Sequence, residues 1–151
     1  MKTVTESALI QRPLEEVFSF VANPMNDPEW SSAVEEALQT SLGALGPGTT
    51  FHQVLRLLGQ RLEASFEVVE YEPTRRLVIR PTSGPARGTG TGRRMFEAVE
   101  GGTRVTFQAE GRLGLFRGLL EPLVAWGSRR QFKIGLARLK DLLEGPRPAG
   151  G

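Results

Sequence analysis

The chain has 151 residues, of which 39% are hydrophobic and 24% charged, a composition that predicts one folded domain and argues against disorder. It contains no cysteine, which excludes disulfides, thiolate nucleophiles and cysteine-bound zinc. The formal net charge is only +2 and the arginines are scattered, so the sequence lacks the basic stripe of a nucleic-acid-binding protein. No nucleic-acid partner is therefore expected.

The segment from Met1 to Glu6 has no signal-peptide apolar stretch, and no apolar run approaches the ~20 residues that span a bilayer. We therefore expect a cytoplasmic protein without membrane insertion.

The first elements are a strand and two short helices. Residues 3–11 alternate between apolar and polar side chains, which predicts a strand. Pro13 suits the first turn of a helix, and the segment 14–22 behind it has an apolar stripe and two glutamates in its first turn. A second short helix is predicted over 26–31, with Asp27 as its cap.

Between residues 33 and 111 the alternation of apolar and polar residues is typical of β-strands. Gly59-Gln60 and Glu100-Gly101-Gly102 have the composition of tight hairpin turns, and 82–92 is a Gly/Pro/Thr-rich loop. The predicted strands are 33–41, 49–58, 61–72, 75–81, 93–99 and 103–111.

The C-terminal part is helical in period. Residues 113–144 carry a drifting apolar stripe, and Pro122 is expected to start the main helix after a short helical turn. Residues 145–151 are predicted to be a frayed tail, so the domain spans 1–144. One face of an antiparallel sheet needs cover, and this helix is the element large enough to supply it.

Several segments carry a resemblance to a known superfamily. They are Ile10 to Phe18, Asn23-Pro24 to Trp30, Val68 to Pro73 with Arg76-Leu77, Gly102 to Thr106, and Leu136 to Lys140 with Leu143-Glu144. With the element order, they resemble the helix-grip superfamily of START-related and birch-pollen-allergen-like proteins, and within it the polyketide cyclase/dehydrase-like group.

The resemblance implies an α+β fold: a curved antiparallel sheet of about seven strands wrapped around a long C-terminal helix, with two short helices after the first strand. Family members include aromatic cyclases and lipid and hormone binders, so the fold alone does not choose a function.

The sequence offers little that indicates catalysis. His52 is the only histidine, and it lies in a strand-like run. If Phe51, Gln53 and Leu55 point inward, the alternation of a strand sends His52 outward, against a catalytic role. A serine–histidine triad or a histidine metal site would need partners that the sequence does not suggest, so no catalytic residue, metal or cofactor is predicted.

Two further features have competing interpretations. Gly88, Gly90 and Gly92 lead into a strand rather than a helix, so a loop at a cavity mouth is favoured over a phosphate-binding site. Arg94 shares the parity of Phe96, which is expected to point inward. It either anchors a ligand carboxylate or carbonyl, or lies in solvent because the register is shifted, and the second alternative has the greater weight.

The leading hypothesis is the binding of a hydrophobic or aromatic small molecule in a cavity between the sheet and the C-terminal helix. One alternative is a polyketide cyclase/dehydrase-like enzyme that acts by orienting its substrate. Another is a protein-interaction module with a filled cavity. A homodimer is left open. The candidate ligand-binding residues are Trp30, Phe51, Leu55, Phe66, Val68, Leu77, Ile79, Phe96, Phe107 and Trp126, with Arg94 as the polar anchor.

Overall fold

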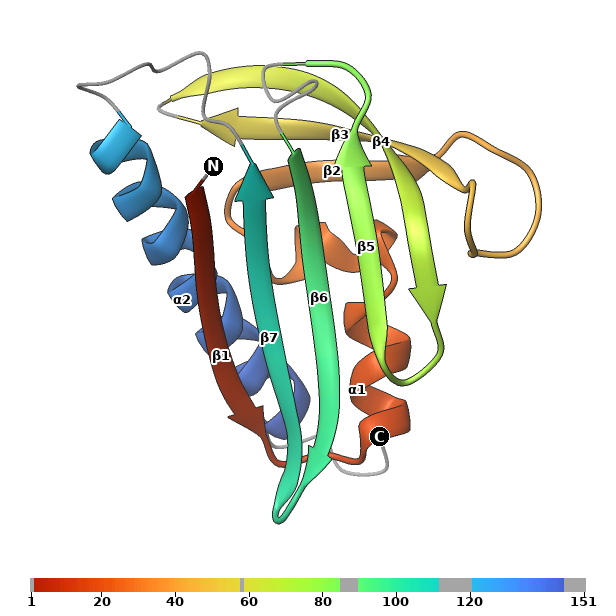
Figure 1. Ribbon diagram of the computed structural model, residues 1–151, viewed down its shortest axis with the longest axis vertical. Helices are drawn as coiled ribbons and strands as arrows, with labels where there is room; N and C mark the ends of the chain where they lie inside the picture. The colour runs from red at the N-terminus through yellow and green to blue at the C-terminus, as the bar shows by residue number, and fades with distance from the viewer. Residues whose placement is uncertain (1, 58, 85–89, 112–120, 146–151) are drawn as a thin grey trace.

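The computed structural model describes residues 2–57, 59–84, 90–111 and 121–145 (Figure 1). Its helices are α1 (Leu14–Val21), the 3₁₀ helix η1 (Pro24–Glu29) and the long α2 (Glu121–Glu144). Its strands are β1 (Lys2–Ile10), β2 (Val34–Gln39), β3 (Thr50–Leu57), β4 (Gln60–Glu72), β5 (Arg76–Pro81), β6 (Gly90–Val99) and β7 (Gly102–Gly111).

The strands form one seven-stranded sheet in the order β1-β7-β6-β5-β4-β3-β2, and every neighbouring pair is antiparallel. The sheet is strongly bent, so that β2 and β3 cross the direction of β1, β7 and β6 (Figure 1). A shift of register between Val68 and Glu70 interrupts the β4–β5 pairing. Irregularities of this kind increase the local bend of a strand. The α+β fold predicted from the sequence is confirmed.

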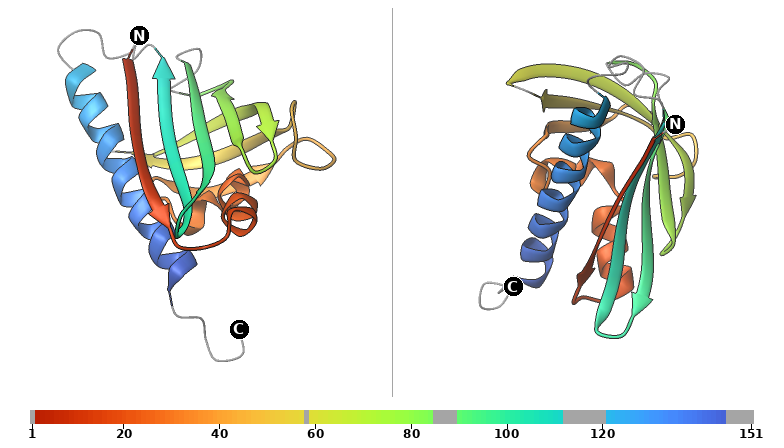
Figure 2. Two further views of the ribbon diagram at one scale, coloured as in Figure 1. Left: turned by 60° about the horizontal axis from the view of Figure 1, so that its bottom comes forward. Right: turned by 60° about the vertical axis from the view of Figure 1, so that its left-hand side comes forward.

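The helices lie on one side of this sheet, with α2 running beside β1 (Figure 2). Helix α1 buries Val17, Phe18 and Val21 and carries Glu15 and Glu16 in its first turn, where the helix dipole favours acidic residues. Pro13 lies one position earlier than predicted, as the residue that caps the helix rather than within its first turn.

The second short helix differs from the prediction in its type and in its cap. It is a 3₁₀ helix capped by Asn23, whose side-chain oxygen accepts a hydrogen bond from the Met25 amide at 3.1 Å. Pro24 follows in the first position, where its missing N–H costs nothing. The prediction that Asp27 caps the helix is therefore wrong, because this aspartate lies inside η1, where it is buried at 2% exposure.

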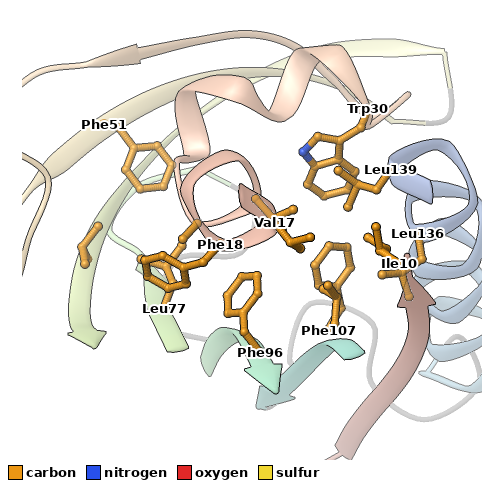
Figure 3. Close-up of a cluster of buried hydrophobic side chains, with 14 residues drawn as sticks. Ile10, Val17, Phe18, Trp30, Phe51, Leu77, Phe96, Phe107, Leu136 and Leu139 are labelled. Carbon is orange, nitrogen blue, oxygen red and sulfur yellow. The ribbon is translucent and has the colours of Figure 1, made fainter. Parts of the chain in front are cut away.

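The core lies between the helices and the concave side of the sheet (Figure 3). Trp30, Leu136 and Leu139 gather with Ile10 near α2, while Phe18 and Phe96 meet edge to face at 5.0 Å. The buried cluster comprises Ile10, Val17, Phe18, Val21, Ala22, Trp30, Phe51, Val68, Leu77, Phe96, Val105, Phe107, Leu136 and Leu139.

Polar contacts fasten the C-terminal end of α2 to the segment after β1. The Lys140 ammonium donates to the Leu9 carbonyl at 3.0 Å, and the Gln11 amide donates to the Glu144 carboxylate at 2.6 Å. Lys140 also donates to Glu144 at 2.7 Å, and this hydrogen bond lowers the pKa of the Glu144 carboxyl. The described helix begins one residue before Pro122. The short turn predicted before it and the tail after Gly145 lie outside the described residues.

Gly135 on α2 lets the helix approach Trp30. A Cβ atom at this position would lie 2.8 Å from Cζ3 of the indole. We expect Gly135→Ala to lower the free energy of unfolding by about 1–3 kcal/mol, even though alanine is the better helix former, because the overpacking outweighs propensity. Urea denaturation measures the change.

The matched control is Gly46→Ala, since a Cβ there would meet nothing within 4 Å. We expect this control to stay within about 0.5 kcal/mol of the parent. Equal effects of the two substitutions would contradict the contact between Gly135 and Trp30.

Candidate functional site

The concave side of the sheet is lined by alternate residues of each strand, paired across the register. Phe51 lies opposite Phe66, and Arg94 lies between Leu77 and Phe107. These side chains face the same core, as the alternation in the sequence predicts.

Burial changes along this inner face. At the end covered by α1 and η1, Leu77 and Val105 have no exposed surface. Further along, Phe66, Ile79 and Leu55 are only half-buried, although they share the same inward parity. The inner face is therefore fully packed beneath α1 and η1 and less completely covered around Phe66 and Ile79, although Ala64 and Val68 beside them are buried at 2% and 1% exposure.

The less covered part, here called the open end, comprises Phe66, Ile79, Gly92 and Ala109. Gly92 lies opposite both Ile79 and Ala109, so two of the three adjacent residues on β5, β6 and β7 are small. A Cβ at Gly92 would make only an ordinary contact of 3.5 Å with Ile79. Crowding therefore does not require glycine at this position. Because Gly92 and Ala109 have little or no side chain, this part of the inner face is less filled by side chains than its surroundings.

Aromatic rings surround the open end. Phe51 and Phe66 stack at 5.1 Å between ring centroids. Phe107 contacts Trp30 at 5.2 Å and Phe132 of α2 at 5.8 Å. These rings supply flat apolar surfaces that suit an aromatic or alicyclic molecule.

Arg94 points inward, so the alternative that placed it in solvent is wrong. Its guanidinium forms a bidentate ion pair with Asp27, with Nη1 at 2.8 Å from Oδ1 and Nη2 at 2.7 Å from Oδ2. Nη1 also donates to the Val21 carbonyl at 2.9 Å. The charged carbon lies 5.3 Å from the Trp30 ring and 5.7 Å from the Phe107 ring, within range of cation–π attraction.

Gln53 completes this group. Its side-chain nitrogen donates to Oδ2 of Asp27 at 3.0 Å and makes a longer contact of 3.4 Å with the Pro24 carbonyl. We refer to Arg94, Asp27 and Gln53 as the polar cluster. It ties η1 to β3 and β6 and lies directly below Gly92 on the inner face, at the floor of the open end.

One buried donor beside this cluster is unpaired. The indole nitrogen of Trp30 has no hydrogen-bond partner among the described residues. The opposite edge of the indole faces Gly135, so the nitrogen points away from α2 (Figure 3).

The predicted site residues fall into three groups. Phe66 and Ile79 belong to the open end, and Phe51, Trp30, Phe107 and Arg94 border it. Leu55 is half-buried on β3 but pairs with Leu62, away from Phe66. Val68, Leu77 and Phe96 are packed in the core at 1%, 0% and 7% exposure. Trp126 lies in α2, but its side chain is outside the described residues, as are Gly88 and its neighbours.

Sequence reasoning missed five residues of this region: Asp27, Gln53, Gly92, Ala109 and Phe132. Gln53 could have been found, because it shares the inward parity of Phe51 and a buried amide needs a partner. The role of Asp27 was missed because aspartate followed by proline is typical of a helix start, and the local sequence fits that interpretation as well as it fits a buried ion pair.

His52 is on the outer face, as predicted, with its Nδ1 3.1 Å from the Ser65 hydroxyl and its Nε2 3.3 Å from the Glu63 carboxylate. The prediction that His52 lacks the partners of a serine–histidine triad is therefore wrong as far as proximity goes, since a serine and an acid lie beside it. Ser65 lies opposite His52 on β4 and Glu63 lies two residues further along that strand; the His52 and Glu63 side chains are 35% and 63% exposed.

A groove of about 580 Å³ borders His52, lined by Pro28, Glu36, Ala37, Leu38, His52, Val54, Arg61 and Glu63. None of the predicted ligand-binding residues lines it.

We expect His52→Ala to change the free energy of unfolding by less than about 1 kcal/mol, because exposed pairs contribute little. The control is the adjacent Phe51→Ala, at a residue with no exposed surface. It is expected to cost about 3–5 kcal/mol. Thermal melting of both variants distinguishes the two faces of β3, and a large loss with His52→Ala would contradict the assignment.

Within the described residues, no cluster of three histidine or acidic side chains could hold a metal ion. In the same part of the chain, no helix is both long enough and apolar enough to cross a membrane.

A bent antiparallel sheet with a long helix packed against its concave side defines a helix-grip protein. The sequence matches the family described as "Polyketide cyclase / dehydrase and lipid transport" over residues 1–144, and the chain belongs to this family. A comparison with curated proteins gives no match.

Solved structures share the fold. A protein of Thermus thermophilus is 20% identical, with a TM-score of 0.79 over 95% of this chain and 97% of that chain. The Zhui aromatase/cyclase of Streptomyces sp. R1128 is 15% identical, with a TM-score of 0.76 over 99% and 98% of the two chains. The Aha1 dimer of Colwellia psychrerythraea is 18% identical, with a TM-score of 0.68 over 98% and 100%.

Proposed function

We propose that the protein binds a hydrophobic or aromatic small molecule at the open end of the concave sheet, between the sheet and α2. The observation that carries this proposal is the burial gradient. Phe66 and Ile79 have the parity of core residues and are only half-buried, whereas Leu77 and Val105 on the same face have no exposed surface. Apolar side chains held in this way gain free energy when a ligand covers them.

Native mass spectrometry of freshly purified protein, looking for a molecule that co-purifies, tests the proposal. A bound apolar compound that is lost on substitution of Phe66 supports it. A ligand-free protein that also fails to bind naphthalene-sized probes in titration calorimetry contradicts it.

A second candidate is a cyclase-like enzyme, favoured by one observation: polar groups converge at the floor of the open end. The family description and the Zhui aromatase/cyclase fit this alternative. The polar cluster, however, satisfies itself, because Arg94 pairs with Asp27 and Gln53 donates to the same carboxylate. Binding therefore remains the better supported function. Turnover of a poly-carbonyl substrate that is abolished by Arg94→Met and kept by His52→Ala would support the enzyme.

We also propose that the protein forms a homodimer, since the Colwellia protein with the same fold is described as a dimer. Among the residues whose side chains are described, the large exposed apolar ones do not mark an obvious face, because they lie on separate elements: Leu9, Leu38, Leu42, Val69 and Leu142. Analytical ultracentrifugation over a range of protein concentrations decides between monomer and dimer.

A further inference from the structure

The charges around the open end restrict the ligands that the proposed site can accept. This inference rests on the proposed binding function and concerns the chemical class of its ligand. Arg94 is the cation at the floor of the open end, and its side chain is 12% exposed. A free arginine in this position would select a carboxylate.

Asp27 already occupies the position that such a carboxylate would take. Both of its oxygens accept from Arg94, and Gln53 donates to one of them. The Asp27 side chain is only 3% exposed, so water screens this pair weakly. An anionic ligand would meet a cation whose charge is cancelled, beside a carboxylate that repels it.

Glu6 is a second acidic residue on the inner face, and it has basic partners of its own. It shares the inward parity of Ala8 and Ile10 on β1 and lies opposite Phe107. Its carboxylate lies 3.7 Å from Arg129 and 3.9 Å from Lys133 of α2. A cationic ligand would have to displace these two partners and would be repelled by their positive charge.

The guanidinium still has hydrogen-bonding capacity. Of its five N–H groups, one donates to Val21 and two to Asp27, so two have no acceptor among the described residues. A ketone, ester or phenol oxygen can accept from such a group without bringing a charge.

We propose that the site takes an uncharged ligand, with ketone, ester or phenol oxygens as its polar atoms, and discriminates against carboxylates and amines of the same shape. The pairing of Arg94 with Asp27 sets this specificity, so Arg94 is neutralised rather than available as an anion anchor.

Three probes of one shape test this: 2-acetonaphthone, 2-naphthoate and 2-naphthylmethylammonium, titrated by calorimetry at neutral pH. The ketone is expected to bind at least about tenfold more tightly than either ion, a ratio that corresponds to about 1.4 kcal/mol. Naphthoate that binds as tightly as the ketone overturns the proposal. If none of the three binds, the proposed function itself fails.

Asp27→Asn removes the counter-charge while keeping the shape of the side chain. We expect the affinity for naphthoate, relative to that for the ketone, to rise about tenfold in this variant. Circular dichroism establishes that the variant is folded. A folded variant that gains no affinity for naphthoate relative to the ketone overturns the proposal.

A second experiment needs no substitution. The affinity of the unaltered protein for 2-naphthol is expected to fall as the pH is raised from about 8 to above the phenol pKa, near that of tyrosine at about 10. The ketone, which does not ionise, is the control for effects of pH on the protein. If the affinity for naphthol changes with pH no more than the affinity for the ketone does, the requirement for an uncharged ligand is contradicted.

Discussion

Replacing Asp27 with alanine is expected to lower the free energy of unfolding by about 3–5 kcal/mol. The substitution leaves the Arg94 guanidinium, whose side chain is 12% exposed, without its counter-charge and with two of its hydrogen bonds lost. It also removes the acceptor of Gln53. Urea denaturation with a two-state fit measures the loss.

A double-mutant cycle separates the ion pair from other effects of the substitution. Arg94→Met in the Asp27→Ala background removes the uncompensated charge, so the double variant should be clearly more stable than the sum of the two single losses predicts. The control is Glu36→Ala. Its ion pair with Arg61 has side-chain exposures of 69% and 55%, and such pairs contribute less than about 1 kcal/mol. Additive losses at Asp27 and Arg94 would contradict the coupling.

Phe66→Asp is the second substitution with a large expected effect. Phe66 is half-buried on the inner face of β4, and its ring stacks on Phe51 at 15° between ring planes. Placing a carboxylate there leaves a charge with poor hydration and no cation within the stack. We expect a loss of about 3 kcal/mol in stability and, in whatever fraction folds, no measurable binding of 2-acetonaphthone.

Two controls identify the cause. Phe66→Leu keeps an apolar side chain and should retain the fold with weaker ligand binding. Val69→Asp places the same carboxylate on the same strand at a residue that is 42% exposed, and it should change stability by less than about 0.5 kcal/mol. If Phe66→Asp is as stable as Val69→Asp and still binds the ketone, the open end is not the ligand site.

The sequence predicted the elements and the inward parity because both depend on local information. Strand alternation places Phe51, Phe66 and Phe107 on one face whatever the rest of the chain does. One exception was the 3₁₀ helix, where Asn23 and Asp27, four positions apart, each precede a proline and could each cap a helix. Asn23 does so, and the choice depends on the burial of Asp27. Another exception was the start of β6, which begins at Gly90 within the predicted loop 82–92.

The polar cluster could not be predicted because it depends on distant pairing. Arg94 and Asp27 are 67 residues apart, and no periodicity links them. The sequence favours a shifted register that leaves Arg94 in solvent, because an unpaired buried charge would be costly. The buried aspartate reverses that balance, and only the position of η1 over the sheet reveals it.

The strand order has a consequence for how the chain folds. Strands β2 to β7 pair with their neighbours in sequence, but β1 pairs with β7, so that Thr5 meets Gln108 at a separation of 103 residues. Pairing over such a distance carries a large entropy of loop closure and slows folding. During synthesis β1 therefore cannot pair within the sheet until β7 has been made. Until they meet, the unpaired edge of β7 is the part of the nascent sheet most open to aggregation.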